Sequence, residues 1–215
     1  MTASREEKNY ARRVVRHLAK HYADAECALN YETPFQLLIA TILSAQCTDE
    51  RVNIVTAGLF AKYPTAYELA KATQKQVEKI VKSAGFYRAK AKNIRACAKE
   101  LVEKYQGQPP RELDQLVALA GVGRKTGNVL LGTAFGIPSG VVVDTHVGRI
   151  SRRLGITFEK DPVKVERDLM SVLPKKDWIY YSHRMIHHGR AICDARKPIC
   201  DECSMKNFCP RIGVK

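Results

Sequence analysis

The chain of 215 residues carries 36 Lys and Arg against 22 Asp and Glu, a formal net charge of +14, and 45% of its residues are hydrophobic. This apolar content excludes a disordered tail or a fibre. No uncharged apolar stretch approaches the roughly 18 residues needed to cross a bilayer. The charged N-terminus lacks the apolar core of a signal peptide, so we expect an intracellular protein without membrane contact. The excess of basic residues, spread over the chain, indicates a polyanionic partner, with RNA-binding roles fitting as well as DNA-binding ones.

Helical patterns fill the first half of the chain. Residues 5–22 are predicted to form an amphipathic helix. Pro34 begins an almost wholly apolar helix with Thr33 as its cap, and we expect this helix to be central. It ends at the small polar stretch 44–49, which contains Gln46. Three further helices are predicted over 50–62, over 66–83, where Gly85 closes the helix, and over 91–105.

The segment 113–133 is predicted to be two helices joined by a tight turn. Gly121 and Gly123 interrupt the helical pattern and permit positive φ angles that other residues resist. The turn and the start of the second helix expose backbone N–H groups, where the helix dipole and the cations Arg124 and Lys125 favour a phosphate oxygen. The alternative is an ordinary helical hairpin whose basic residues are solvated.

The second half is also predicted to be helical until the chain becomes rich in cysteine. Val141–Val143 is the only strongly strand-like run, and three residues are too few for a sheet, so we expect a buried connector. Asp144 is expected to cap a helix that runs through Arg153. Further helices are predicted near 162–173 and 177–190. Because strand signals are nearly absent, the sequence predicts an all-α fold.

Four of the seven cysteines lie close together in the sequence, with the spacing C-x6-C-x2-C-x5-C. Since the total is odd and the chain is expected to be intracellular, a disulfide framework is disfavoured. Four thiolates in one loop are typical of a zinc site or a four-cysteine iron–sulfur site, and the spacing alone leaves both open. The basic residues of this loop could bind a second phosphate or could simply be solvated. The cysteines are Cys193, Cys200, Cys203 and Cys209.

Five sequence segments together resemble the endonuclease III family of helix–hairpin–helix DNA glycosylases over nearly the whole chain. They are SAQCTDE, GFYRAKA, LAGVGRKTGNVLL, VVVDTH and HHGRAICDARKPICDEC, followed by the final cysteine. The resemblance implies an all-α, two-lobed helix–hairpin–helix DNA glycosylase fold. Its parts are an N-terminal helix (1–25) packing on the cluster lobe, a six-helix barrel lobe (26–136) with the hairpin at about 113–133, and a cluster lobe (137–215). It also implies a [4Fe–4S] cluster in the loop 193–209, bound by Cys193, Cys200, Cys203 and Cys209.

The resemblance further implies a bifunctional DNA glycosylase and AP lyase of base excision repair. Such an enzyme excises oxidised pyrimidines from duplex DNA and cleaves the abasic site by β-elimination through a lysine Schiff base. Lys125 would be the nucleophile, which must be neutral, and the helix dipole, burial and Arg124 would all oppose its protonation. Asp144 would stabilise positive charge on the sugar and manage protons at Lys125. The residues implied to contact DNA are Gln46, which fills the gap left by the extruded nucleotide, and Phe86, Gly121, Gly123 and Arg124.

The sequence departs from the family pattern at two positions, and other functions compete. Phe86 replaces a leucine that wedges the opposite strand, and Gly127 replaces an alanine. The alternatives are a mismatch glycosylase acting on thymine, uracil or adenine, and a non-catalytic DNA clamp or redox module. The presence of both Lys125 and Asp144 favours the enzyme, because binding requires neither. We expect a monomer that binds duplex DNA containing damaged pyrimidines or abasic sites, in the cytoplasm or nucleoid if the source is bacterial.

Overall fold

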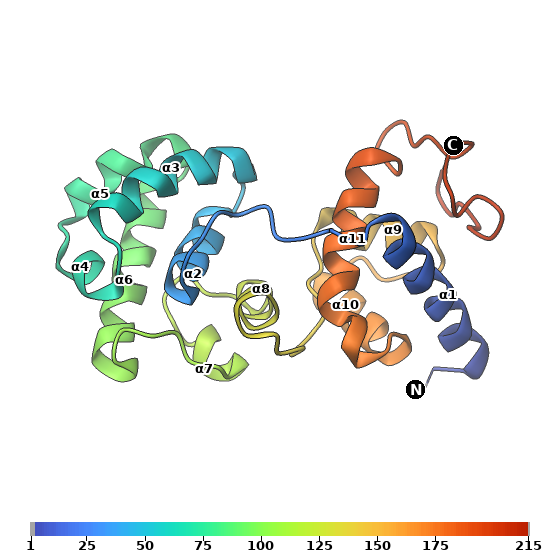
Figure 1. Ribbon diagram of the computed structural model, residues 1–215, viewed down its shortest axis with the longest axis horizontal. Coiled ribbons are helices and arrows are strands. Elements are labelled where there is room, and N and C mark those ends of the chain that lie inside the picture. The colour runs from blue at the N-terminus through green and yellow to red at the C-terminus, as the bar shows by residue number, and fades with distance from the viewer. Residues whose placement is uncertain (1–2, 215) are drawn as a thin grey trace. The chain divides into compact units, whose positions relative to one another are not determined.

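The computed structural model describes residues 3–214, and this part of the chain is helical without any strand, which confirms the predicted all-α fold (Figure 1). The chain divides into two compact units. The central unit comprises residues 28–139, and the terminal unit comprises the described residues up to 27 together with those from 140 onward. No helix within residues 3–214 is long and apolar enough to span a membrane.

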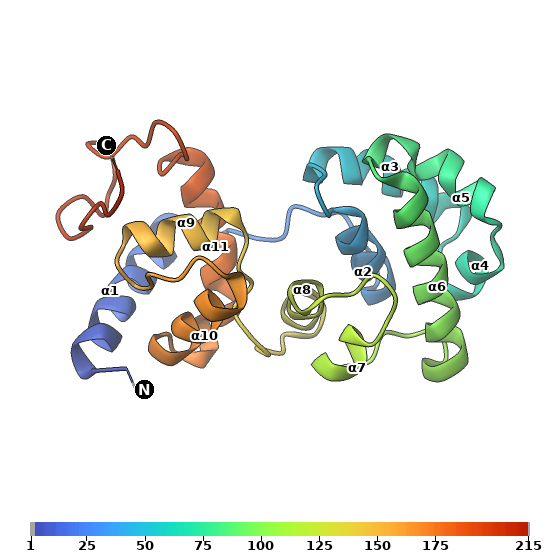
Figure 2. The same cartoon turned by 180° about the vertical axis from the view of Figure 1, so that it is seen from behind.

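The central unit is built around a helix that is buried on all sides. In chain order its helices are α2 (Pro34–Leu43), α3 (Asp49–Lys62), α4 (Ala66–Lys71), α5 (Gln74–Val81), η1 (Lys82–Ala84), α6 (Tyr87–Tyr105), α7 (Leu113–Val117) and α8 (Arg124–Phe135). Every residue of α2 from Phe35 to Leu43 is buried, and α2 packs against α3, α6 and α8 (Figure 2). The predicted central helix is therefore confirmed, as is its Thr33 cap, whose hydroxyl accepts the N–H of Gln36.

Two predicted boundaries in this unit are wrong. The segment 66–83 is not one helix but α4, α5 and η1, because Thr73 starts a new helix with a capping box. The Thr73 hydroxyl accepts the N–H of Gln76, and the Gln76 amide oxygen accepts the N–H of Thr73. Helix α6 begins at Tyr87 rather than Ala91, because Gly85 and the left-handed Phe86 complete the turn in two residues.

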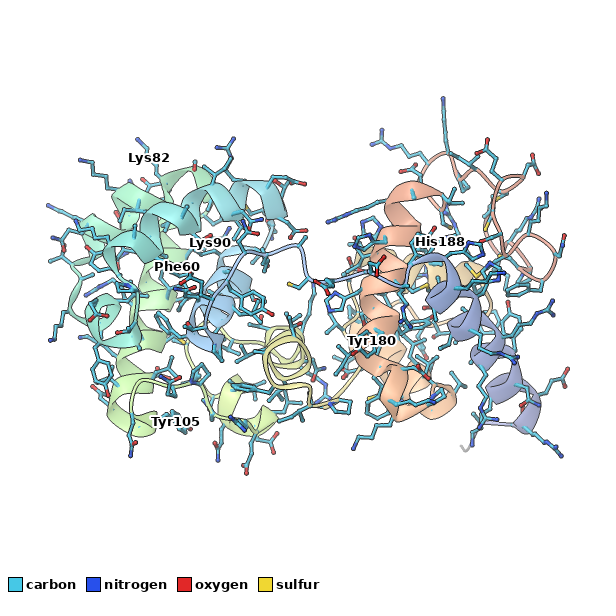
Figure 3. All side chains as sticks on the ribbon, viewed as in Figure 1. Phe60, Lys82, Lys90, Tyr105, Tyr180 and His188 are labelled. Carbon is cyan, nitrogen blue, oxygen red and sulfur yellow. The ribbon has the colours of Figure 1, made fainter. Side chains whose placement is uncertain are left out.

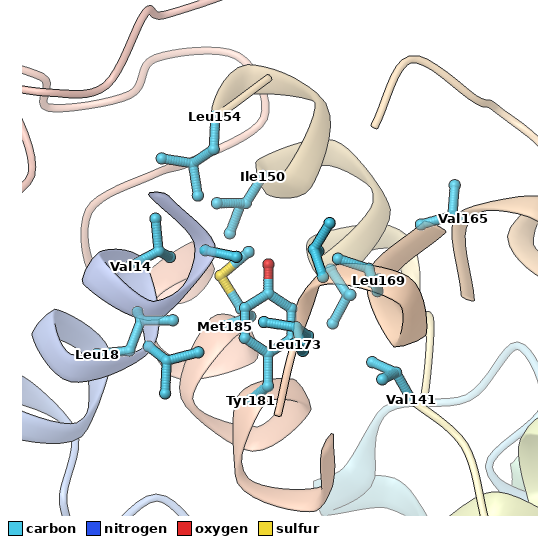
Figure 4. Close-up of a cluster of buried hydrophobic side chains, with 14 of the residues drawn as sticks. Val14, Leu18, Val141, Ile150, Leu154, Val165, Leu169, Leu173, Tyr181 and Met185 are labelled. Atoms are coloured by element: carbon cyan, nitrogen blue, oxygen red, sulfur yellow. The ribbon is translucent and has the colours of Figure 1, made fainter. Parts of the chain in front are cut away.

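The terminal unit combines the N-terminal helix with the last third of the chain. Its helices are α1 (Arg5–His21), α9 (Thr145–Arg153), α10 (Pro162–Val172), η2 (Lys175–Asp177) and α11 (Trp178–Ala191), followed by the cysteine-rich loop. Their apolar faces meet in one core that includes Val14, Leu18, Ile150, Leu169, Tyr181 and Met185 (Figure 4).

Polar groups in this core are paired, and the valine run behaves as predicted. The Tyr181 hydroxyl lies 3.0 Å from Ser151 Oγ, which satisfies both buried hydroxyls. Val141 and Val143 are buried in the same core, which confirms the expected buried connector. The Ser182 hydroxyl donates to the carbonyl of Val142 at 2.9 Å and so ties the connector to α11.

Candidate functional site

The turn between α7 and α8 needs glycine at Gly121 for two reasons. Its φ is +77°, and a Cβ added there would lie 2.8 Å from Cβ of Asn93 on α6. Gly123 differs, because its φ is −94° and its ψ 173°, an extended conformation open to any residue. Only Gly121 therefore uses the freedom that the sequence pattern indicated. A Cβ at Gly123 would meet nothing within 4 Å, so the backbone there is open to approach.

Gly123 is the N-cap of α8 and leaves the N-terminus of this helix without a side-chain cap. The first N–H groups of a helix have no partner within it and carry the positive end of the helix dipole. Lys125 lies in this first turn, and its side chain is exposed. The expected burial of Lys125 is therefore not found in this chain.

Gly127 allows α7 and α8 to pack closely. A Cβ at this position would lie 2.7 Å from Cδ1 of Leu113, the first residue of α7. The glycine thus makes room for Leu113, and an alanine would require that side chain to shift.

Asp144 is the N-cap of α9 in the terminal unit, as predicted. Its Oδ1 accepts the N–H of Val147 at 2.7 Å, and the side chain is half-buried. This charge-assisted bond fixes the carboxylate group in one orientation. Two residues further on, burial lowers the pKa of His146, while the Asp144 carboxylate acts in the opposite direction. Asp144 therefore combines a structural bond with a fixed negative charge.

Gln46 and Phe86 share an unusual backbone conformation in two loops of the central unit. Gln46, after α2, has a φ of +52°, and Phe86, before α6, has a φ of +45°. This left-handed region is unfavourable for residues with a Cβ. Both side chains are exposed, and 71% of the Phe86 side chain is accessible. The loops therefore hold a polar and an aromatic side chain outward in strained conformations.

A residue that the sequence analysis did not single out lies beneath the second of these loops. Lys90, labelled in Figure 3, lies in the first turn of α6. It is only 5% exposed, and its Nζ donates to the carbonyl of Ala84 at 2.6 Å. Burial lowers the pKa of Lys90, while the nearby Cys47, in its thiolate form, acts in the opposite direction. The signal in the sequence is the spacing, because Lys90 falls on the helix face that carries Ile94 and Leu101.

The four cysteines of the C-terminal loop line one pocket of the terminal unit, together with the apolar side chains of Ile150, Leu154 and Met205. The cysteines are Cys193, Cys200, Cys203 and Cys209. Burial raises the pKa of Cys203 and that of Cys209, and the other cysteines add to this effect. Within residues 3–214, no three His, Cys, Asp or Glu side chains are arranged to hold a single metal ion.

Donors from outside and inside the loop point at the cysteine sulfurs. The Arg153 guanidinium donates to Cys193 Sγ at 3.2 Å and to the carbonyls of Asp194 and Ala195 at 2.6 and 2.9 Å. The N–H of Met205 donates to Cys203 Sγ at 3.4 Å. Such donors stabilise thiolates, the form in which cysteines bind iron. Arg153 therefore anchors the loop to α9 and faces its first cysteine.

A buried histidine lies near Cys203. His188, labelled in Figure 3, lies on α11. It is 2% exposed, and its Nδ1 and the Tyr22 hydroxyl are 3.0 Å apart. Its Nε2 lies 3.8 Å from Cys203 Sγ. Burial lowers the pKa of His188 to about 4, so the ring is neutral near pH 7.

Comparisons with known proteins agree on one family. Residues 39–175 match the HhH-GPD superfamily of base excision DNA repair proteins. The chain is 51% identical to endonuclease III of Synechocystis sp., over 94% of this chain and 93% of the relative. It is 47% identical to endonuclease III of Bacillus subtilis, over 90% of this chain and 88% of the relative.

Solved structures give the same result. A trapped covalent intermediate of an endonuclease III with DNA has a TM-score of 0.89 and 43% sequence identity, covering 95% of this chain and 96% of that one. The structure of a thermostable thymine-DNA glycosylase has a TM-score of 0.84 and 21% sequence identity, covering 94% of this chain and 95% of that one. At this low identity the similarity shows the fold alone.

Proposed function

The chain belongs to the endonuclease III family of base excision repair enzymes, DNA N-glycosylases with AP lyase activity, and we propose that it acts on oxidised pyrimidines and abasic sites in duplex DNA. The observation that carries this proposal is the N-terminus of α8. It has no side-chain cap, its Gly123 backbone is open to approach, and it presents Lys125 in its first turn. This arrangement suits a DNA phosphate beside a nucleophilic amine.

Lys125 would be the nucleophile. Its neutral amine attacks the sugar C1′, the bond from C1′ to the base breaks, and the base leaves with the bonding electron pair and takes up a proton. Loss of a proton from nitrogen and opening of the sugar give a Schiff base. Removal of a proton from C2′ then expels the 3′ phosphate by β-elimination, and water releases the lysine. Asp144 would stabilise the positive charge that develops on the sugar, and its bond to the Val147 N–H keeps the carboxylate oriented for that role.

Five further residues would bind and open the duplex. The turn residues Gly121 and Gly123, with Arg124, would contact a backbone phosphate. Gln46 would occupy the space left by the extruded nucleotide, and the exposed ring of Phe86 would enter the opposite strand. The backbone strain and exposure of both side chains support this assignment.

The loop 193–209 would hold a [4Fe–4S] cluster on Cys193, Cys200, Cys203 and Cys209. Four sulfurs around one apolar pocket, with Arg153 and a backbone N–H directed at two of them, fit a cluster ligated by thiolates. When bound, the cluster would cross-link the loop and fix its cations, including Arg196 and Lys197, for contact with phosphates. A brown protein with broad absorbance near about 400 nm is expected, whereas a colourless protein with stoichiometric zinc would contradict this assignment.

The two compact units support the proposed lobes. We assign a six-helix barrel lobe with the hairpin to residues 26–136, and a cluster lobe to 137–215 with the N-terminal helix packed on it. The units divide between Cys27 and Ala28 and between Ser139 and Gly140.

The test is borohydride trapping on duplexes that contain one thymine glycol or one abasic site. Wild type should form a covalent adduct, and Lys125→Gln should not. Lys99→Gln, which removes an exposed charge on α6, is the matched control and should trap as wild type does. No wild-type adduct on either duplex, with binding intact, would refute the lyase mechanism and favour a monofunctional glycosylase or a clamp. Release of thymine or uracil from mismatches in preference to thymine glycol would favour the mismatch alternative.

A further inference from the structure

Lys90 occupies a position where an apolar residue would normally pack. It lies one turn before Ile94 on the buried face of α6, and its side chain is 5% exposed. The ammonium group makes a hydrogen bond to the carbonyl of Ala84 at 2.6 Å. A lysine stem usually extends along an apolar surface to bring its charge to water. Here the charged end is directed inward at a backbone group, so stability alone does not explain the choice of lysine.

The carbonyl that Lys90 binds belongs to the loop that presents Phe86. Ala84 ends η1, and it is followed by Gly85 with a φ of +68° and Phe86 with a φ of +45°. The carbonyl of Phe86 then accepts the N–H of Lys90 at 3.1 Å. Lys90 therefore holds this short loop at two points, with its side chain at Ala84 and with its backbone at Phe86.

The second strained loop follows α2, a neighbour of the helix that carries Lys90. Cys47, which follows Gln46 directly, would in its thiolate form oppose the effect of burial on the pKa of Lys90. The loop itself is short, because the N–H of Cys47 bonds back to the carbonyl of Ser44 at 3.1 Å and Thr48 caps α3. Helix α2, which leads into this loop, packs directly on α6. Lys90 thus bonds to the loop of Phe86 and lies on the helix that packs against α2, which leads into the loop of Gln46.

We propose that Lys90 is a positioning residue for base extrusion, which sets the Phe86 loop against the Gln46 loop so that both side chains enter the duplex together. This inference rests on the function proposed above, in which Phe86 and Gln46 open the duplex. Lys90 is buried and acts through the Ala84 carbonyl, without touching DNA. Without that bond, the left-handed Phe86 can relax, and its ring loses the fixed direction needed to separate stacked bases.

The proposal predicts a split between the two activities of the enzyme. Extruding a damaged nucleotide requires unstacking and unpairing of its base, whereas a preformed abasic site has no base to unstack. Misplacing the loops should therefore slow base release more than it slows cleavage of an abasic site. A general loss of folded enzyme would reduce both activities by the same factor.

The experiment measures single-turnover base release from a thymine glycol duplex and single-turnover strand cleavage at a preformed abasic site. For Lys90→Met we expect base release to fall by about tenfold to hundredfold, with much less change in abasic-site cleavage. Phe86→Ala is the comparator and should change the ratio of the two rates in the same direction. Lys99→Met is the matched control, because Lys99 is an exposed lysine on the same helix, and it should leave the ratio unchanged.

If Lys90→Met fails to fold, Lys90→Gln also tests whether the bond to the Ala84 carbonyl positions the loop. The glutamine side chain keeps a polar group at this buried position but is too short to reach that carbonyl. An equal loss of both activities in the folded variant, or no loss at all, would overturn the proposal. Wild-type enzyme that cleaves abasic sites but releases no damaged base would instead refute the proposed glycosylase function, and this inference with it.

Discussion

Asp144 is predicted to have two separable roles, and the structure indicates how to separate them. Its Oδ1 caps α9 by accepting the N–H of Val147 at 2.7 Å, and its negative charge is proposed to stabilise the cationic sugar. Asparagine caps helices as well as aspartate does but carries no charge. Asp144→Asn should therefore keep the stability of the protein and lose its activity, whereas Asp144→Ala should lose both.

The expected magnitudes follow from the two interactions. Loss of the cap in Asp144→Ala should cost about 1 kcal/mol, which lowers Tm by about 2–4 °C for a chain of this size. Loss of the charge in either variant should reduce the single-turnover rate of base release by about 10²–10³-fold, the usual effect of removing one electrostatic contact to a transition state. Thermal unfolding and rapid-quench measurement of base release give the two numbers independently.

Asp161 supplies the matched control for the cap. Its Oδ1 accepts the N–H groups of Val163 and Lys164 at the start of α10, and it lies at an exposed position outside the proposed site. Asp161→Ala should lower Tm to a similar extent and leave base release unchanged. If Asp144→Asn released base at the wild-type rate, Asp144 would be a helix cap alone and the proposed mechanism would be refuted.

Three further predictions follow from individual contacts. Gly121→Ala should destabilise the protein by about 1–3 kcal/mol in urea unfolding and weaken duplex binding, because the added Cβ would meet Asn93. Gly136→Ala is the control, because Gly136 has a similar positive φ but open space around it, so this variant should show the backbone strain without the clash. Arg153→Met should accelerate loss of the absorbance at about 400 nm under air, because four loop contacts of its guanidinium disappear. Equal bleaching rates in wild type and variant would contradict this. Burial lowers the pKa of His183 below its usual 6.5, so the unfolded chain binds a proton more readily and the free energy of unfolding should fall as the pH drops below that value. In His183→Gln the urea midpoint should therefore fall less between about pH 7 and pH 5. An identical fall in wild type and variant would contradict this.

Local signals in the sequence predicted the elements that depend on local physics. The apolar composition of α2 predicted a central helix, and the structure buries it throughout. The Thr33–Pro34 and Asp144 caps were also predictable, because an N-cap bond involves residues two or three apart in sequence. The break within 66–83 was missed because the helical periodicity continues across Thr73 and hides the capping box of Thr73 and Gln76, which starts a new helix.

Contacts between distant residues were not predictable. Arg153 lies in the last turn of α9 among other basic residues, and nothing in its neighbourhood indicates that its guanidinium binds carbonyls about forty residues away. His188 was likewise one histidine among several on α11, and its pairing with Tyr22 depends on how α1 packs against α11. Lys90 shows the same limit, because its spacing predicts a buried position but not the Ala84 carbonyl that it binds.

The backbone of the central unit gives evidence of function that is independent of any resemblance. A left-handed conformation costs roughly 1–2 kcal/mol for a residue with a Cβ. Gln106 adopts it at the end of α6, where it terminates a helix in the ordinary way. Phe86 adopts it as the N-cap of α6, and Gln46 adopts it two residues before Thr48, the N-cap of α3. Both side chains are exposed, so burial of apolar surface does not offset the cost of the conformation. Such strain persists only where surrounding contacts impose it. At the Phe86 loop one such contact is the bond from Lys90 to the Ala84 carbonyl, the contact on which the proposed positioning role of Lys90 depends.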